Sequence, residues 1–262
     1  MPGPKDINEV LQSYVDKVLV LTVPRFRERQ QKVKQRLEGI SFEFFYGCDK
    51  NELTPQFIHQ HYTYDKKNSL AVSYNFKPLN TGEIACSLSH RNIYQAMIDN
   101  NWQRVLVLED DVVPDKDKLV LLKDCLNELP DDWELLYLGY MKNERPTFGR
   151  KIKQGWYKIM AALGMSRIPL KMIKNRLPKN YSTHLWKAGF HDCTHAYAVS
   201  ISGAKKLLAV QTPVIYRADN LLSALVMKDE IKAFASKSFL FNQEVFTDNT
   251  DQSQIREKWA NQ

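Results

Sequence analysis

Residues 104–115 read Arg-Val-Leu-Val-Leu-Glu-Asp-Asp-Val-Val-Pro-Asp, and this stretch decides the fold. Val105 to Leu108 is an unbroken apolar run, typical of a strand that is buried on both faces in the middle of a parallel sheet. Three acids end the run, and Pro114 stops further strand pairing. Because open α/β sheets bind ligands at the carboxyl ends of their strands, the acids are expected at a ligand site.

The acids Glu109, Asp110 and Asp111 form the first candidate site. Massed carboxylate oxygens suit Mg²⁺ or Mn²⁺, which proteins usually share with a substrate phosphate. The alternative is a solvated acidic turn after the strand. A cation site is favoured because acids this close repel one another unless a cation lies among them.

The amino-terminal region predicts a strand-helix-strand unit. Val18 to Val23 is a second buried strand, 25–37 is a charged helix closed by Gly39, and Phe42 to Tyr46 is an aromatic strand. This order predicts a βαβ unit, and therefore a parallel sheet with right-handed crossovers.

Three arginines, Arg25, Arg27 and Arg29, directly follow the first strand. They are expected near the same sheet edge as the acids, where Arg25 and Arg29 could bind a diphosphate. The alternative is that they are solvated on a helix surface.

A helix is predicted from Asn80 to about Asn100, with Asn80 as its N-cap and Glu83 at the spacing of a capping box. Four residues at helical spacing share an inward face: Cys86, His90, Ile93 and Met97. His90 is therefore interpreted as a hydrogen-bonded core histidine, and the alternative is a metal ligand.

Further elements are predicted along the remaining chain. They are a helix over 116–129, a strand over 133–138 ending at Gly139, a strand over 195–201, a helix containing Ala204, Leu207 and Leu208, and a helix over 221–227. The tail from Asn242 is polar and is expected to be only partly ordered.

Composition limits the class of protein. A hydrophobic fraction of 44% supports a real core, and the net charge is +7. The four cysteines are widely spaced and fit no zinc pattern, so we expect reduced thiols in a cytoplasmic protein. No secretory signal and no run long enough to span a bilayer is recognisable.

The segment from Arg145 to Phe190 has a different composition. It contains eleven Lys or Arg and no Asp or Glu, with apolar residues interleaved. Such a mixture favours an anionic membrane surface or an anionic substrate, and the alternative is a solvated insertion. The candidate contact residues are Lys151, Lys153, Trp156, Arg167 and Lys171. Nucleic acid is not expected, because no nucleic-acid motif is present.

Several chemistries are excluded by the absence of their motifs. The chain has no GxGxxG after a strand, no P-loop, no aspartyl-phosphate motif and no GxSxG elbow. A carboxylate-bound metal beside arginines fits instead a nucleotide-diphosphate leaving group.

Two motifs together resemble a known family. Residues 81–90 read Thr-Gly-Glu-Ile-Ala-Cys-Ser-Leu-Ser-His, and 105–112 read Val-Leu-Val-Leu-Glu-Asp-Asp-Val. The combination resembles glycosyltransferase family 25, the enzymes of lipopolysaccharide or lipooligosaccharide biosynthesis. The first strand with its arginines and the unit from Ala196 to Leu208 resemble further parts of that family. The resemblance covers most of the chain except the basic segment and the tail.

The resemblance implies a GT-A fold, a Rossmann-like α/β fold that binds nucleotide-diphospho-sugars. It also implies a UDP-sugar donor, Mn²⁺ or Mg²⁺, and inversion at the sugar carbon. By match to the DxD-type motif, Asp111 would bind the metal directly and Glu109 would serve the metal and the ribose. The donor-binding residues are expected to be Thr22, Arg25, Arg29, His90, Glu109 and Asp110.

Transfer needs a carboxylate that accepts the proton of the attacking hydroxyl. Asp219 is the first candidate and Asp192 the second, although Asp219 could equally cap the helix that follows it. His191 and His195 could supply a further metal ligand, but a structural role is favoured for each.

We therefore expect one GT-A catalytic domain over residues 1–262, with a basic, partly helical insertion at 141–190. It would transfer galactose or glucose from a UDP-sugar to the anionic core oligosaccharide of a lipopolysaccharide, at the cytoplasmic surface of the inner membrane. The alternative is a noncatalytic basic module that binds anionic lipid or nucleic acid.

Overall fold

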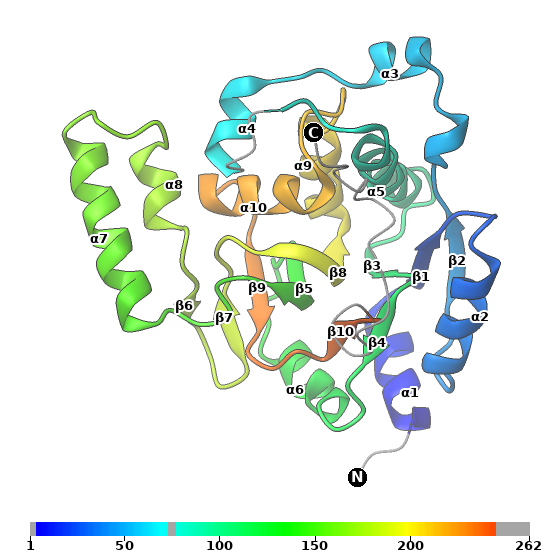
Figure 1. Ribbon diagram of the computed structural model, residues 1–262. Coiled ribbons are helices and arrows are strands. Elements are labelled where there is room, and N and C mark those ends of the chain that lie inside the picture. The colour runs from blue at the N-terminus through cyan, green and yellow to red at the C-terminus, as the bar shows by residue number, and fades with distance from the viewer. Residues whose placement is uncertain (1–3, 73–76, 245–262) are drawn as a thin grey trace.

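The structure is a computed structural model that describes residues 4–72 and 77–244 (Figure 1). Within these residues an eight-stranded sheet has the order β2-β1-β3-β8-β5-β9-β7-β6, and β10 pairs with β4. The strands are β1 (Lys17–Thr22), β2 (Glu43–Tyr46), β3 (Arg104–Glu109), β4 (Val112–Pro114), β5 (Leu135–Met141), β6 (Lys179–Asn180), β7 (Leu185–Lys187), β8 (Asp192–Ser200), β9 (Ala233–Ser236) and β10 (Phe241–Gln243).

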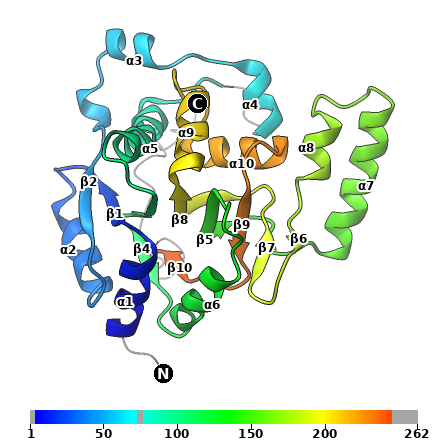
Figure 2. The ribbon, with the colours of Figure 1, turned by 180° about the vertical axis from the view of Figure 1, so that it is seen from behind.

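Helices pack on both faces of the sheet (Figures 1 and 2). One face is covered by α1 (Pro4–Tyr14), α2 (Arg27–Arg36) and α6 (Leu122–Asn127), and the other by α4 (Lys66–Val72), α5 (Thr81–Asp99), α9 (Ile201–Val210) and α10 (Ala218–Lys228). The remaining helices are α3 (Pro55–His61), α7 (Phe148–Ala162), α8 (Leu170–Lys174) and two short 3-10 turns, η1 (Lys50–Glu52) and η2 (Leu119–Leu121).

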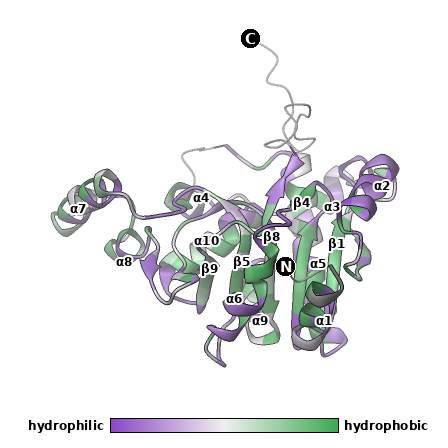
Figure 3. Cartoon of the chain, turned by 90° about the horizontal axis from the view of Figure 1, so that it is seen from below, coloured by the Kyte–Doolittle hydropathy of each residue, from purple (hydrophilic) through white to green (hydrophobic). Residues whose placement is uncertain are grey.

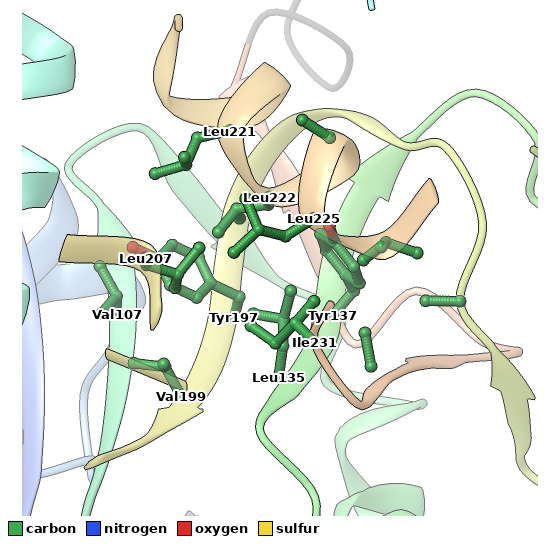
Figure 4. Close-up of a cluster of buried hydrophobic side chains, with 14 of the residues drawn as sticks. Val107, Leu135, Tyr137, Tyr197, Val199, Leu207, Leu221, Leu222, Leu225 and Ile231 are labelled. Atoms are coloured by element: carbon green, nitrogen blue, oxygen red, sulfur yellow. The ribbon is translucent and has the colours of Figure 1, made fainter. Parts of the chain in front are cut away.

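Strand β3 joins the two apolar cores. Its residues alternate, with Val105 and Val107 in the core under α5 and α9, and Leu106 and Leu108 in the core over α1 and α6. All four are at most 1% exposed, so each contributes about 1.5–3 kcal/mol of burial free energy. Figure 4 shows part of the first core, where Val107 lies beside Leu207 and Tyr197. The prediction of a strand buried on both faces is confirmed.

The sheet is mixed, and the prediction of a parallel surrounding for β3 was wrong on one side. β1 pairs in parallel with β2 and β3, as the βαβ prediction requires. On its other side β3 pairs antiparallel with β8, where Val107 lies opposite Tyr197. An apolar run cannot reveal this, because a buried strand has the same composition beside either kind of neighbour.

Helix α5 begins as predicted. The Asn80 side chain accepts from the Glu83 backbone N–H, and the Glu83 carboxylate accepts from the Asn80 N–H, so the capping box is complete. The helix predicted over 116–129 is shorter than expected and is split into η2 and α6. Asp115 accepts a hydrogen bond from the Lys118 backbone, which forms a turn in place of the first helical turn.

Strand β5 continues beyond Gly139, where the sequence predicted its end. A Cβ on Gly139 would lie 2.4 Å from His195 Nε2 and 2.7 Å from the Phe241 carbonyl oxygen. The glycine therefore permits a close approach of β8 and β10 to β5, with a register shift at this point.

The segment 141–190 leaves the sheet after β5 and returns to it through β6 and β7. Its helices α7 and α8 stand side by side at one end of the molecule, and Figure 3 shows α7 as the outermost element there. Gln154 ties them together by donating to the Ile173 carbonyl at 2.7 Å. The prediction that this segment is partly helical is confirmed.

Two further expectations concern the chain as a whole. No disulfide joins any of the four cysteines within the described residues, in agreement with the expected reduced thiols. Among the described residues, no helix has the length and apolar character needed to cross a membrane. Of the polar tail, Asn242 and Gln243 lie in β10, whereas 245–262 lie outside the described residues.

Candidate active site

The three acids after β3 lie at the carboxyl edge of the sheet, but their environments differ. Asp110 is buried and both of its oxygens are engaged, because Thr22 Oγ1 donates at 2.6 Å and Arg29 Nη1 at 2.6 Å. Burial raises the pKa of Asp110, while the nearby Arg29 guanidinium lowers it. Asp110 thus links the end of β1 to α2 and holds the loop in place.

Glu109 and Asp111 converge on one donor. The Gln243 amide nitrogen lies 3.3 Å from Glu109 Oε2 and 3.4 Å from Asp111 Oδ1. Burial, and next the charge of Glu109, raise the pKa of Asp111 to about 7, although Arg29 at 3.3 Å opposes this. Two hard oxygen ligands that meet at one point and repel each other fit Mg²⁺ or Mn²⁺.

His90 lies behind Glu109 on α5. The ring is buried, Nδ1 is 2.8 Å from the Tyr197 hydroxyl, and Nε2 is 3.6 Å from Glu109 Oε1. Within the described part of the chain Nε2 has no hydrogen-bond partner. The inward face predicted for Cys86, His90, Ile93 and Met97 is correct, with Cys86 only partly buried.

Cys86 connects the acids of β3 to the candidate base. Its ligand atom lies with those of His90 and Glu109 within 4.8 Å of one another. Burial raises the pKa of the Cys86 thiol well above its usual value, and the charges of Glu109 and Asp219 raise it further. Asp219 of α10 thus contributes negative charge at the Cys86 thiol, as Glu109 does.

The two arginines that follow β1 have different partners. Arg29 pairs with Asp110 and Asp111, so the sequence correctly placed it at the edge that holds the acids. Arg25 instead pairs with the buried carboxylate of Asp49 and lies over the Phe26 ring. Arg29 therefore supplies positive charge directly beside the acids, and Arg25 supplies it one loop away.

Asp192 and Asp219 form a second pair of carboxylates. Asp192, at the start of β8, pairs with Lys142, and Asn220 donates to its other oxygen at 3.5 Å. Asp219 accepts from the backbone N–H groups of Cys193 and Asn220. It lies in the first turn of α10, whose N-cap is Arg217. Burial, and then the charge of Asp192, raise the pKa of Asp219.

His191 and His195 both have structural contacts. His191 is fully buried, with Nδ1 3.0 Å from the Lys142 carbonyl and Nε2 accepting from the Gly189 N–H at 3.2 Å. His195 has Nδ1 2.8 Å from the Cys193 carbonyl and Nε2 2.9 Å from that of Phe241. Since every ring nitrogen faces a backbone group, the structural interpretation of both histidines is the better one.

The candidate residues of the basic segment separate into two groups. Lys153 of α7 lines a cavity of about 460 Å³, together with Asp192 and with residues that follow β5 and α8. The other four are exposed and do not line it: Lys151, Trp156, Arg167 and Lys171.

Sequence reasoning did not identify Gln243 or the cavity residues Lys142, Arg176 and Arg217. Gln243 lies far along the chain from the acids and belongs to no motif. For Arg176, the absence of acids from its segment indicated an anionic contact, but it did not show which of the basic residues would face a ligand.

The open sheet and the acids at its carboxyl edge define an α/β protein of the kind that binds its ligand at that edge. A family model described as glycosyltransferase family 25 (LPS biosynthesis protein) matches residues 15–222. The chain therefore belongs to glycosyltransferase family 25, as its two motifs indicated. Its mixed α/β sheet agrees with the fold expected for a GT-A enzyme.

Relatives with curated names match parts of the chain. Procollagen galactosyltransferase 2 of Homo sapiens is 30% identical over 138 residues, which are 52% of this chain and 18% of that protein. Procollagen galactosyltransferase 1-A of Xenopus laevis is 26% identical over 230 residues, 84% of this chain and 33% of that protein. The chain thus spans about a fifth to a third of the length of these relatives. Among solved structures, mouse xyloside xylosyltransferase 1 aligns with a TM-score of 0.38 and 10% identity, over 88% of this chain and 79% of that one.

Proposed function

We propose that this chain is an inverting glycosyltransferase that moves a hexose from a UDP-sugar to the core oligosaccharide of a lipopolysaccharide or lipooligosaccharide. Galactose is the first candidate for the hexose and glucose is the second. The convergence of Glu109 and Asp111 on one point at the carboxyl end of β3 carries the proposal. The description of the matching family supports the acceptor, and the names of the relatives support galactose.

Donor binding is assigned to the edge where β1 and β3 end. Asp111 and Glu109 would hold Mn²⁺ or Mg²⁺, which when bound neutralises charge on the diphosphate leaving group. Arg29 adds positive charge beside them. Arg25, which pairs with Asp49 in this structure, is assigned to the diphosphate on the basis of the sequence alone. Thr22 and Asp110 fix the position of Arg29. The His90 Nε2 lies 3.6 Å from Glu109 Oε1, on the inner side of this edge.

Proton removal from the acceptor hydroxyl is assigned to Asp219, with Asp192 as the second candidate. A carboxylate with a raised pKa is a stronger base, and burial together with Asp192 raises the pKa of Asp219. The Cys193 and Asn220 backbone N–H groups hold the Asp219 carboxylate in one orientation.

Membrane association is assigned to the outer side of α7. Five large apolar residues lie on one stripe of this helix and are more than half exposed: Phe148, Ile152, Trp156, Ile159 and Leu163. Exposed basic residues accompany the stripe along the chain, among them Lys151 and Arg167. An apolar stripe with basic flanks fits the surface of an anionic bilayer, which we take to be the cytoplasmic face of the inner membrane.

The acceptor assignment is tested with purified lipooligosaccharide core and UDP-galactose. The expected result is a gain of one hexose by mass spectrometry, with UDP-glucose giving less product. Transfer to a procollagen peptide but not to the core would contradict the proposed acceptor.

Membrane association is tested by sedimentation with vesicles. Binding to vesicles of phosphatidylglycerol and phosphatidylcholine is expected, with little binding to pure phosphatidylcholine and a steep fall from 50 to 500 mM salt, where screening is strong. The double variant Ile152→Ser/Trp156→Ser should reduce binding at least about tenfold, because each change removes about 1.5–3 kcal/mol of apolar burial. Tyr181→Ser is the matched control, since Tyr181 is also exposed but follows β6 and is not part of α7. Equal binding of the double variant and the wild type would contradict the assignment.

A further inference from the structure

A cavity of about 460 Å³ is lined by α7, by residues that follow β5 and α8, and by Asp192 at the start of β8. Its volume is within the range of small-molecule sites. It is separate from the edge where Glu109 and Asp111 meet, and none of the three acids after β3 lines it. Asp192, the second candidate base, does line it, so a molecule held in the cavity would lie beside the carboxylate pair Asp192 and Asp219.

The wall of this cavity carries an excess of positive charge. Five cations and a single acid, Asp192, line it: Lys142, Arg150, Lys153, Arg176 and Arg217. Lys142 is neutralised by Asp192, and Arg150 approaches Glu144 at 3.5 Å. Lys153 and Arg176 form no ion pair with any carboxylate of the described residues. Two cations that face a ligand-sized cavity without a counter-ion indicate an anionic ligand.

Aromatic rings hold these two cations in position. The Arg176 guanidinium lies 4.9 Å from the centroid of the buried Phe190 ring, and the Lys153 ammonium lies 5.9 Å from that of Tyr157. A ring face orients a guanidinium without using its N–H donors, which lie in the guanidinium plane. Among the described contacts the Arg176 side chain donates no hydrogen bond, so its donors remain available for a planar or tetrahedral oxyanion.

The backbone around Asp192 is unusual. Lys142, Asn143 and Cys193 all have positive φ angles, of 57°, 53° and 49°. Residues other than glycine rarely adopt a positive φ angle, and such residues are found at ligand sites more often than elsewhere. Two of the three residues line the cavity and the third follows Asp192 directly.

We propose that this cavity is the acceptor site and that it recognises an acidic group, a phosphate or a carboxylate, on the acceptor saccharide. Arg176 and Lys153 bind the group, and Asp192 faces the sugar that carries it. Identifying the ligand as the acceptor rests on the proposed glycosyl transfer. Recognition of an anionic sugar rests on the cavity alone. The two sides of α7 then have different tasks, since Lys153 and Tyr157 face the saccharide and the apolar stripe faces the membrane.

The test measures binding of four probes to the whole chain by ligand-observed NMR: glucose 6-phosphate, glucuronate, glucose and inorganic phosphate. Glucose 6-phosphate or glucuronate should bind at least about tenfold more tightly than glucose, and the tighter of the two identifies the acidic group. Inorganic phosphate should compete with it. Equal affinity for charged and neutral sugars would overturn the proposal.

Variants locate the binding site. Arg176→Gln should weaken binding of the anionic sugar at least about tenfold. Lys158→Gln, on the same helix but outside the cavity wall, should leave it unchanged. If Arg176→Gln does not fold, as judged by its melting curve, Lys153→Gln gives the same comparison. Loss of binding in Lys158→Gln alone, or retention in both cavity variants, contradicts the assignment.

A separate readout distinguishes this inference from the proposed function. UDP release from UDP-galactose by the wild-type chain reports on the donor site without any acceptor. Anionic sugars that bind a chain without UDP release would support the cavity and count against glycosyl transfer. UDP release with no preference for anionic sugars would overturn the cavity proposal and leave the transferase proposal in place.

Discussion

At the scale of single residues, one arginine, Arg29, neutralises the acids at the carboxyl end of β3, the edge to which donor binding is assigned. Arg29 donates to Asp110 and approaches Asp111, and Asp110 is buried with Thr22 as its other partner. The sequence predicted that Arg29 and the acids would meet, because the carboxyl ends of neighbouring parallel strands share one edge. It did not predict Gln243, which joins Glu109 and Asp111 from 134 and 132 residues away. A contact between such distant residues depends on how β10 pairs, and no local pattern encodes that.

Arg29→Gln should lower the free energy of unfolding by about 3 kcal/mol, because it leaves the buried Asp110 carboxylate without its cation. Adding Asp110→Asn removes that charge and should restore part of the loss. Urea denaturation of the two single variants and the double variant measures the coupling. Arg27→Gln, which removes an exposed cation from the first residue of the same helix, is the control and should change little. Additive effects of the two substitutions would contradict a direct pair.

His191 should make the protein sensitive to acid. Burial lowers the pKa of His191 to about 4. The neutral ring is the form in which Nε2 accepts a hydrogen bond from the Gly189 N–H. The unfolded chain then binds the proton first, so the stability from His191 is complete above its ordinary pKa and is lost as the pH falls toward 4.

Between pH 7.5 and 5 this group alone should lower the free energy of unfolding by about 2 kcal/mol. Urea denaturation at both pH values measures the loss, and His191→Asn should show a smaller one. An identical pH slope in the variant would show that other groups cause the acid sensitivity.

At the scale of elements, the sequence predicted local features well. It predicted the parallel pairing of β1 with β2 and β3, but not the pairings of β8 and β10. The start of α5 followed from Asn80 and Glu83, because a capping box involves only four consecutive residues. The antiparallel direction of β8 and the existence of β10 did not follow, since both depend on distant partners. For α7 the composition predicted an anionic contact. Only the helix geometry separates the residues that face the cavity from those that face outward.

Two glycines should respond in opposite ways to alanine. Gly139→Ala places a Cβ 2.7 Å from the Phe241 carbonyl oxygen, so β10 must shift, and we expect a loss of about 2 kcal/mol in stability. Because β10 carries Gln243, UDP release should fall as well. Gly155→Ala, inside α7 with nothing within 4 Å of the new Cβ, should stabilise the helix by up to about 1 kcal/mol. Thermal denaturation compares the two, and equal melting temperatures would contradict the close packing at Gly139.

At the scale of the whole molecule, the charges are separated. The net charge is +7, yet acids gather at the donor edge while the segment from Arg145 to Phe190 has none. Under the two proposals, a cation binds among the acids at the end of β3 and an anionic group binds in the cavity beside Asp192. The basic composition would then serve a substrate on one side of α7 and a membrane on the other.

The central claim is that Glu109 and Asp111 bind a metal and a UDP-sugar. The most direct measurement is UDP release from a panel of UDP-sugars, with Mn²⁺ and then with EDTA, for the wild type and Asp111→Asn. Many glycosyltransferases slowly hydrolyse their donor, so no acceptor is needed.

We predict metal-dependent release, fastest with UDP-galactose, and a fall of at least about 100-fold in Asp111→Asn. Asp117→Asn, an exposed acid in the loop that follows β4, is the control and should behave as the wild type. Release that is unaffected by EDTA, or an Asp111→Asn variant that is as active as the wild type, would contradict the claim. Absence of both UDP release and UDP binding would favour a noncatalytic basic module instead.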